Sequence, residues 1–325
     1  MSTRRMVIVL AIAIAFAAPF NSSAQQPAPH LRRIGVLLFN SPQIDPIGPF
    51  LEGLQALGYV EGKNVTFDYA YAEGNAELLP ELAVALVARK PDMIFAYGGD
   101  VAPHAKAATK SIPIVVMVSN DPVQSGLVAS IPKPGGNVTG LTLIYDDLAG
   151  KMLELLKEAQ PAMSRVGVLW NPNHADPEFR ETKRVALSKN IDLLSLEIRR
   201  PGDFDGAFKA AIDGRAEGLI AVSSRLLLMQ RKKITAFAAN SRLAAIGSWG
   251  DWANDGFLLT YGPDVPEAMR RVAVYSDKVL RGERPGDLPI ERPTRFELVV
   301  NLKTAKALGL TISPTLLARA DRVIE

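Results

Sequence analysis

The sequence predicts an α/β protein made of two similar lobes, each a doubly wound parallel sheet. From Arg33 onward, short apolar runs rich in β-branched residues alternate with stretches of helical periodicity, as expected for βαβ units. Arg165–Leu169 repeats Arg33–Leu37 almost residue for residue, and the order of elements after it repeats too. The chain has 325 residues, 48% of them hydrophobic, which is enough for one large or two medium domains.

The first half begins with an apolar strand and ends in the run Ile114–Val118, which has the composition of a buried parallel strand. Gly58 ends the first helical stretch and Pro91 follows the second. The predicted elements are strands at 34–39, 65–71, 93–96 and 114–118 and helices at 46–57, 76–89 and 102–109.

The second half repeats this order over nearly the same length. Arg33–Pro113 and Arg165–Leu243 correspond, which favours two similar lobes, although strand starts in α/β proteins often look alike. The predicted elements are strands at 165–169, 193–198, 219–222 and 243–246 and helices at 177–188, 204–212 and 226–239.

The N-terminus has the pattern of a secretory signal. Arg4 and Arg5 precede an apolar run from Met6 to Phe20, and small residues follow up to Ala24. A membrane anchor is the alternative, but the run is shorter than the roughly 20 residues that span a bilayer. We therefore predict a signal peptide at 1–24, cleavage before Gln25, and a periplasmic mature protein.

Composition and motifs argue against several function classes. Without Arg4 and Arg5 the 37 basic residues become 35, against 34 acidic ones, and no basic run suggests nucleic-acid binding. The absence of cysteine excludes disulfides and thiolate metal sites. The three histidines are isolated, and no phosphate-binding glycine loop or nucleophile elbow occurs. We expect no enzymatic activity, no metal and no cofactor.

Polar and aromatic residues follow the predicted strands of both halves, where open α/β sheets bind their ligands. Each serine or asparagine could instead be only a helix N-cap. The candidate ligand-binding residues are Asn40, Ser41, Gly98, Gly99, Asp100, Ser119, Asn120 and Asp121 in the first half, and Trp170, Asn171, Ser223, Ser224, Ser248 and Trp249 in the second.

These residues suit a small zwitterion. An ammonium needs a carboxylate, which Asp121 or Asp100 would supply, although Asp121 could instead cap the turn at Pro122. Trp170 and Trp249 could cover an aromatic or branched side chain, or could be core residues, and a sugar is the competing ligand. The predicted carboxylate-binding group is Ser41, Gly99, Ser119 and Ser223.

Several stretches are similar to one known family, the periplasmic substrate-binding components of ABC transporters, in the group that includes tryptophan-type binding proteins. They are Leu54–Asn64, Leu79–Ala83, Asp121–Val123, Pro134–Gly140, Leu169–Pro172 and Phe296–Leu310. The resemblance covers about Arg33 to Glu325. It implies a type I periplasmic-binding fold whose chain crosses three times between lobes, near 139–143, 261–263 and 291–294. The lobes would comprise 33–141 plus about 262–290, and 142–261 plus about 291–325.

The resemblance also implies a function and partners. The chain would be the solute-binding component of an ABC importer, a monomer that delivers a small molecule to permease and ATPase subunits. A receptor that feeds a membrane sensor kinase is the alternative. A repressor of this fold would carry a helix-turn-helix where this chain has its leader. The chain departs from the family pattern at Ser223–Arg225 and Ser248–Trp252, so the ligand contacts of the second lobe are expected to differ.

Overall fold

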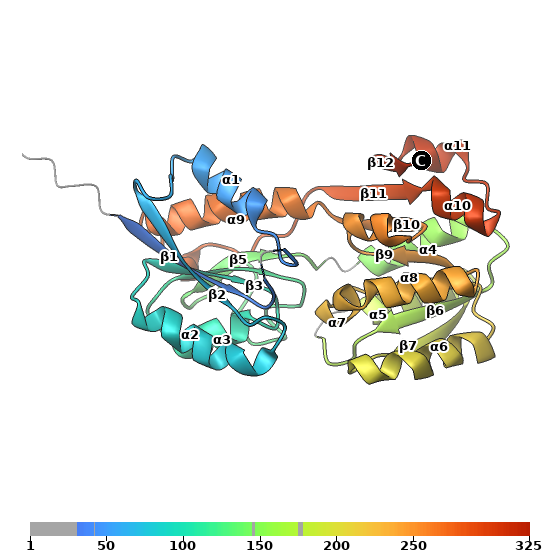
Figure 1. The fold of residues 1–325 in the computed structure, drawn as a ribbon, viewed down its shortest axis with the longest axis horizontal. Helices are drawn as coiled ribbons and strands as arrows, with labels where there is room; N and C mark the ends of the chain where they lie inside the picture. The colour runs from blue at the N-terminus through green and yellow to red at the C-terminus, as the bar shows by residue number, and fades with distance from the viewer. Residues whose placement is uncertain (1–30, 42, 145–146, 175–177) are drawn as a thin grey trace, which may run out of the picture. The chain divides into compact units, whose positions relative to one another are not determined.

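A computed structural model describes residues 31–41, 43–144, 147–174 and 178–325. These residues form two lobes, each built on one β-sheet (Figure 1). We call them the first and the second lobe in chain order. The predicted signal peptide, residues 1–24, lies outside the described residues.

The first lobe contains a five-stranded parallel sheet in the order β2-β1-β3-β4-β5. Its central strands are buried, β4 along its whole length and β1 from Ile34 onward, as in sheets covered on both faces. The elements are β1 (Arg32–Leu38), α1 (Gly48–Ala56), β2 (Val65–Tyr71), η1 (Ala76–Leu78), α2 (Leu79–Ala88), β3 (Met93–Tyr97), α3 (Ala102–Ala108), β4 (Ile114–Val118) and β5 (Val138–Thr142).

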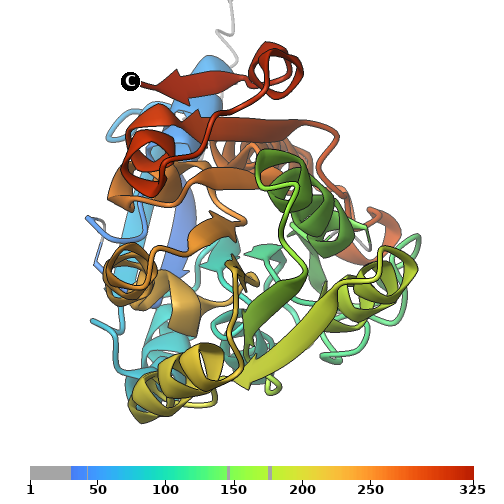
Figure 2. The same cartoon turned by 90° about the vertical axis from the view of Figure 1, so that its right-hand side faces the viewer.

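The second lobe contains a seven-stranded sheet in the order β12-β11-β10-β9-β8-β6-β7, with helices on both of its faces (Figure 2). All of its neighbouring strands are parallel except β10 and β11. The elements up to the last crossing are α4 (Leu148–Ala159), β6 (Arg165–Trp170), α5 (Glu178–Ser188), β7 (Asp192–Glu197), η2 (Pro201–Asp203), α6 (Phe204–Asp213), β8 (Gly218–Ala221), α7 (Arg225–Met229), α8 (Arg231–Asn240), β9 (Ala244–Gly247), η3 (Gly250–Asp255) and β10 (Leu259–Pro263). After the last crossing come β11 (Phe296–Asn301), α10 (Leu302–Leu308), α11 (Pro314–Ala318) and β12 (Arg322–Ile324).

The two sheets share one strand order. The first sheet runs β2-β1-β3-β4-β5, and the first five strands of the second lobe run β7-β6-β8-β9-β10, which is the same 2-1-3-4-5 arrangement. This is the doubly wound order in which ligands bind beyond the carboxyl ends of the strands. The predicted fold class and the repeat from Arg33 and Arg165 are thereby confirmed.

Each sheet is sandwiched between two apolar cores. In β1, Ile34, Val36 and Leu38 face one cluster and Leu37 faces the other, following the two-residue period of a strand. The strands β6, β8 and β9 divide their side chains in the same way. The apolar runs of the sequence thus fix which residues are internal and leave the strand ends to carry polar groups.

The chain crosses between the lobes three times, as the fold class requires. It leaves the first lobe after β5 and returns after β10 into α9 (Val265–Leu280), which packs against α1, β4 and β5. After η4 (Pro285–Asp287) it passes back through Glu291, whose backbone pairs with Gly140 and Thr142 of β5. These segments match the predicted crossings. The lobe boundaries at about 141, 262 and 290 stay a prediction.

Two predicted helices were wrong in detail. The helix expected over 226–239 is two helices, α7 and α8, separated at Gln230. No glycine or proline marks that break, so periodicity alone could not reveal it. The helix expected from Ala76 begins as the 3₁₀ turn η1, where the Asn75 side chain accepts the N–H of Glu77. The other predicted elements differ by a residue or two at their ends.

Among the described residues, none of the helices combines the length and the apolar character needed to cross a bilayer.

Candidate functional site

The predicted site residues lie at or just beyond the carboxyl ends of strands. Asn40 and Ser41 follow β1, Gly98–Asp100 follow β3 and Ser119–Asp121 follow β4. In the second lobe, Trp170 ends β6 and Asn171 follows it, Ser223 and Ser224 follow β8, and Ser248 and Trp249 follow β9. The two sets of ends face each other, because side chains from them are in contact across the lobes.

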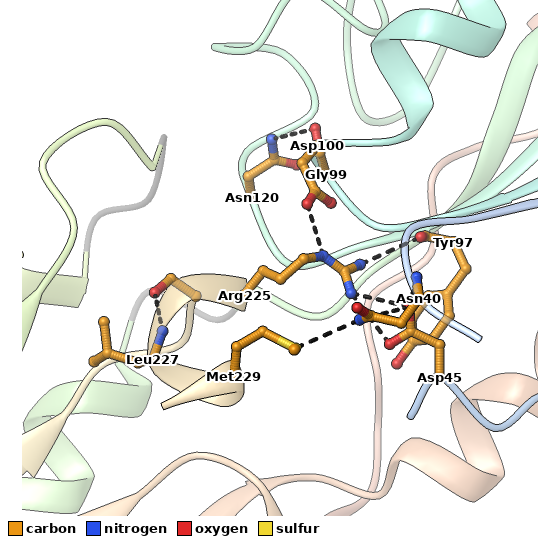
Figure 3. Close-up of polar contacts among 10 residues, drawn as sticks. Asn40, Asp45, Tyr97, Gly99, Asp100, Asn120, Arg225, Leu227 and Met229 are labelled. Carbon is orange, nitrogen blue, oxygen red and sulfur yellow. Dashed lines mark hydrogen bonds and ion pairs between the residues drawn. The ribbon is translucent and has the colours of Figure 1, made fainter. Parts of the chain in front are cut away.

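The contact between lobes centres on Arg225, the first residue of α7 (Figure 3). Its Nη1 donates to both carboxylate oxygens of Asp45, at 3.1 and 3.0 Å, and its Nε lies 2.6 Å from Oδ2 of Asp100. The Nε pair is an ion pair without the alignment of a hydrogen bond. Nη2 lies 3.5 Å from the carbonyl oxygen of Tyr97. We call Asp45, Asp100 and Arg225 the inter-lobe charge cluster.

The first lobe holds its side of this cluster rigidly. The backbone N–H of Asn40 donates to Oδ2 of Asp45 at 3.0 Å, and the Asn40 side chain donates to the same oxygen at 3.2 Å. The Asn40 amide also lies 3.6 Å from the sulfur of Met229, in the second lobe. Asp45 is therefore held in part by its own lobe.

Burial strengthens the cluster. The side chains of Asp45 and Arg225 are 2% and 16% exposed, so solvent screens their attraction weakly. Burial works to lower the pKa of Arg225, but the charges of Asp100 and Asp45 outweigh it and raise that pKa. Burial, reinforced by Asp45, raises the pKa of Tyr97 to about 12. The cluster holds two carboxylates and one guanidinium, so it carries a net charge of −1.

Oδ1 of Asn120 and the hydroxyl of Ser223 are among the buried polar atoms that have no hydrogen-bond partner in the protein, and Ser223 precedes Arg225 by two residues. The side-chain amide nitrogen of Asn120 donates to the backbone carbonyl of Gly99 at 3.4 Å. The backbone carbonyl of Asn120 accepts the Thr142 hydroxyl. Buried polar groups are nearly always paired, so the two unpaired atoms distinguish these residues among the predicted site residues.

Three predicted site residues have structural roles in the described structure. Oδ1 of Asp121 accepts the backbone N–H groups of Val123 and Gln124, so this residue caps the turn that follows β4. Ser224 caps α7 by accepting the N–H of Leu227 at 3.3 Å. Asn171 accepts the N–H of Asn173 in the turn after β6. Oδ2 of Asp121 is not used by this cap, so a ligand-binding role for Asp121 stays a prediction.

The tryptophans divide between lobe interior and lobe interface. Trp170 stacks on Phe179 with ring centroids 4.0 Å apart and donates to Ser195, both in its own lobe. Trp249 is half-buried and packs against apolar clusters of both lobes. Trp252 is buried in the second-lobe core beside Phe257. Trp249 is thus the tryptophan with neighbours in both lobes.

Sequence reasoning missed Asp45, Tyr97 and Phe39, whose ring centre lies 4.8 Å from the guanidinium carbon of Arg225. It noted Arg225 only as a departure from the family pattern. Asp45 lies in a loop five residues after Asn40, where nothing in the sequence separates it from a solvated loop residue. Arg225 directly follows the predicted pair Ser223–Ser224, which was the available signal. Ser41, Ser119 and Ser248 lie where predicted, at the strand ends, and the hydroxyl of Ser248 lies 3.8 Å from the sulfur of Met152.

Two cavities lie away from the inter-lobe charge cluster. One, of about 340 Å³, is lined by Lys106 and by residues 126–129 and 134–138 of the first lobe. The other, of about 260 Å³, lies against the third crossing and α9. Over the described ranges no group of histidine, aspartate and glutamate residues is arranged to hold a metal ion.

Sequence comparison finds a matching family and a named relative. The model of the family described as ABC transporter substrate binding protein matches residues 39–324. A tyrosine-binding protein of Clostridioides difficile (strain R20291) is 27% identical over 294 residues, which is 89% of this chain and 84% of that protein.

Structure comparison finds the same architecture in solved proteins. A conserved domain protein from Vibrio cholerae O1 biovar El Tor is 28% identical, with a TM-score of 0.83 over 90% of this chain and 99% of that one. A Streptococcus pneumoniae ABC domain in complex with L-Trp is 24% identical, with the same TM-score and coverage. A ligand-free, open substrate-binding protein from Clostridium difficile is 24% identical, with a TM-score of 0.71 over 90% and 99% of the two chains.

Proposed function

Because this chain belongs to the family of ABC transporter substrate-binding proteins, we propose that it captures an aromatic or branched amino acid between its lobes for an ABC importer. Proteins of this family bind solutes and are not enzymes. The carrying observation is the inter-lobe charge cluster, which has a net charge of −1. The unpaired atoms of Asn120 and Ser223, two further predicted site residues, support the same reading. A zwitterion could satisfy each of these groups.

The ammonium of the ligand is assigned to Asp100. Two carboxylates share one guanidinium in the cluster, so one further positive charge neutralises it. Oδ2 of Asp100 faces Arg225, and its side chain is 38% exposed, which leaves Oδ1 for a ligand. Asp121 is the other candidate, but one of its oxygens already serves two backbone N–H groups.

The carboxylate of the ligand is assigned to donors from both lobes. The Ser223 hydroxyl is buried and has no protein partner, so it can donate to a carboxylate oxygen. Ser41, Gly99 and Ser119 complete the predicted group from the first lobe. Charge-assisted hydrogen bonds of this kind are shorter and stronger than neutral ones.

The side chain of the ligand is assigned to the Trp249 region. Trp249 touches apolar clusters of both lobes, and Tyr97 belongs to the first-lobe cluster that it touches. Aromatic walls favour flat, apolar groups. The named relatives include a tyrosine-binding protein and a protein solved with L-Trp, which is consistent with such a ligand.

Calorimetry and tryptophan fluorescence of the protein lacking residues 1–24 test the ligand class. We expect saturable binding of at least one of L-tryptophan, L-tyrosine, L-phenylalanine or L-leucine. The emission change should be lost in Trp249→Phe and kept in the matched core variant Trp252→Phe. Binding of a sugar with no response to any amino acid would overturn the ligand class and leave the fold untouched.

Paired variants test the ammonium assignment. Asp100→Asn should weaken amino-acid binding roughly tenfold to a hundredfold, because the ammonium of the ligand loses its charged partner. Asp121→Ala should cost about 1 kcal/mol of stability, as for a lost cap, and leave affinity unchanged. The opposite pattern would move the ammonium site to Asp121.

Export and transport are tested separately from ligand binding. If the signal peptide is correct, protein recovered from the periplasm starts at or near Gln25, whereas an intact Met1 terminus in membranes contradicts it. Permease and ATPase genes beside this gene, and loss of uptake when they are deleted, are expected for an importer. A neighbouring sensor kinase gene without them would favour the receptor alternative.

A further inference from the structure

We propose that the first lobe carries a guanidinium-binding pocket and that Arg225 of the second lobe is its built-in occupant. In this role Arg225 latches the lobes together and keeps cationic side chains out of the site. The inference goes beyond the proposed function, because it concerns the closure of the lobes whatever ligand they capture.

The pocket offers a partner to every nitrogen of the guanidinium. Asp45 accepts from Nη1 at 3.1 and 3.0 Å, Asp100 lies 2.6 Å from Nε, and the Tyr97 carbonyl lies 3.5 Å from Nη2 (Figure 3). The flat face of the group lies 4.8 Å from the centre of the Phe39 ring. Carboxylates at the edges and an aromatic ring at the face are how proteins recognise guanidinium groups.

All of these partners belong to the first lobe, and the pocket is shaped independently of Arg225. Asn40 orients Asp45 through its backbone and side-chain N–H groups. Gly98 provides the space: a β-carbon there would collide with Nη2 of Arg225 and come within 2.6 Å of Oδ1 of Asp100. Gly98 also has a φ of 122°, a conformation that other residues rarely adopt.

Two consequences follow from the filled pocket. Opening the lobes must break a weakly screened ion pair, so Arg225 favours the closed arrangement even without ligand. A ligand with a guanidinium or amine side chain meets a pocket that is already occupied. Since specificity includes the exclusion of wrong ligands, Arg225 is a specificity-determining residue.

The test compares Arg225→Ala with Arg231→Ala. Arg231 is a matched control, since it pairs with Asp255 at 2.6 Å within the second lobe. The chain lacks cysteine, so Val84→Cys and Ile212→Cys, both exposed and one on each lobe, can carry spin labels. In the ligand-free protein, Arg225→Ala should raise the ratio of open to closed molecules, as read from the label distances, by about tenfold or more. Arg231→Ala should leave that ratio unchanged.

Ligand binding to the emptied pocket is the second readout. Arg225→Ala should bind methylguanidinium and L-arginine at least tenfold more tightly than the wild type, and L-citrulline, which lacks the charge, should gain nothing. Adding Asp45→Asn should abolish that gain. Arg225→Lys keeps the charge but cannot reach all three partners, so it should give an intermediate open population.

Several results would contradict the proposal that Arg225 holds the lobes together. Unchanged label distances in Arg225→Ala, with or without weaker amino-acid binding, would make Arg225 a ligand contact or a surface residue. Failure of Arg225→Ala to gain methylguanidinium binding would show that no such pocket exists. If Arg225→Ala does not fold, label distances in Arg225→Lys equal to those of the wild type decide against the proposal. The amino-acid panel on the wild type tests the proposed function independently.

Discussion

The two lobes share a strand order but carry opposite charges at corresponding positions. Asp100 follows β3 and Arg225 follows β8, and these strands occupy the same place in their sheets. The two residues then meet as an ion pair with 2.6 Å between Nε and Oδ2. A duplicated sheet order is dictated by burial, whereas the loops beyond it are free to differ. Divergence of equivalent loops has thus made two similar lobes complementary.

Other features are shared by both lobes because the sheet itself needs them. The backbone N–H of Arg33 donates to Asp92 at 2.7 Å, and that of Arg165 donates to Glu217 at 3.2 Å. Asp92 precedes β3 and Glu217 precedes β8, so a hydrogen bond from a backbone N–H to a carboxylate joins the first and third strands of each sheet. We call it the strand-joining hydrogen bond. Whatever both lobes keep is expected to serve stability, and whatever differs is expected to serve binding.

The largest expected effect comes from a glycine that each lobe places in its fifth strand. A β-carbon on Gly140 would collide with the backbone oxygen of Val116, and one on Gly262 with that of Ser248. Gly140 also has a φ of 135°. Gly140→Ala and Gly262→Ala should each cost about 3 kcal/mol or more, because neighbouring backbone must move. Urea unfolding measures this loss.

Glycines without such neighbours serve as controls for both lobes. Gly136→Ala in the first lobe meets nothing within 4 Å and should change stability little. Gly206→Ala lies inside α6 with open space around it, and should raise stability by about 0.5–1 kcal/mol. Wild-type stability in either strand variant would show that the fifth strands tolerate a side chain and are not a shared requirement.

A smaller effect is expected where the lobes differ. Ser223→Ala removes a buried hydroxyl that has no protein partner, so ligand-free stability should stay unchanged or rise slightly. Amino-acid affinity should fall roughly tenfold, as for one lost charge-assisted hydrogen bond. Calorimetry and thermal unfolding report the two quantities.

The control for Ser223 is a serine that is equally buried but already paired. The Ser276 hydroxyl donates to the carbonyl of Val272 within α9 at 2.9 Å. Ser276→Ala should therefore lower stability slightly and leave affinity unchanged. If both variants lose stability and neither loses affinity, Ser223 is a structural residue and the second lobe binds the ligand through other groups.

The sheets could be predicted from the sequence because burial leaves a local record. Strands such as Ile114–Val118 are continuous apolar runs, and the repeat of Arg33–Leu37 at Arg165–Leu169 located the second lobe. The break between α7 and α8 at Gln230 has no comparable signal in the sequence, since neither proline nor glycine occupies it. It depends on how α7 and α8 pack, which the sequence does not display.

The candidate site was predictable by position but not by partner. Strand ends indicated Asn40, Asp100, Asn120 and Ser223, because a parallel sheet brings its carboxyl ends to one edge. The pairing of Arg225 with Asp45 joins residues 180 positions apart in different lobes. A long-range ion pair has no periodicity, so only the folded arrangement could show it. Whether these residues contact a ligand stays a prediction.

The smallest expected effect on stability concerns the strand-joining hydrogen bond of the second lobe, at Glu217, and its dependence on pH. The backbone N–H of Ser164 is the main cause that holds the pKa of Glu217 below its ordinary value of 4.5, with burial opposing it and Arg165 assisting. A carboxylate with a lowered pKa in the folded state stabilises the protein above the unfolded value. That contribution is lost as the pH falls through the lower, folded value.

Glu217→Gln should therefore cost about 1 kcal/mol or less at pH 7, since an amide oxygen accepts the same N–H groups more weakly than a carboxylate. The difference between variant and wild type should shrink as the pH falls below 4.5, the ordinary value, because protonation removes the charge from the wild type too. Urea midpoints at pH 7 and near pH 3 measure it, with the exposed Glu283→Gln as control. If the difference in urea midpoint is the same at both pH values, the shape of the Glu217 side chain, and not its charge, stabilises the second sheet.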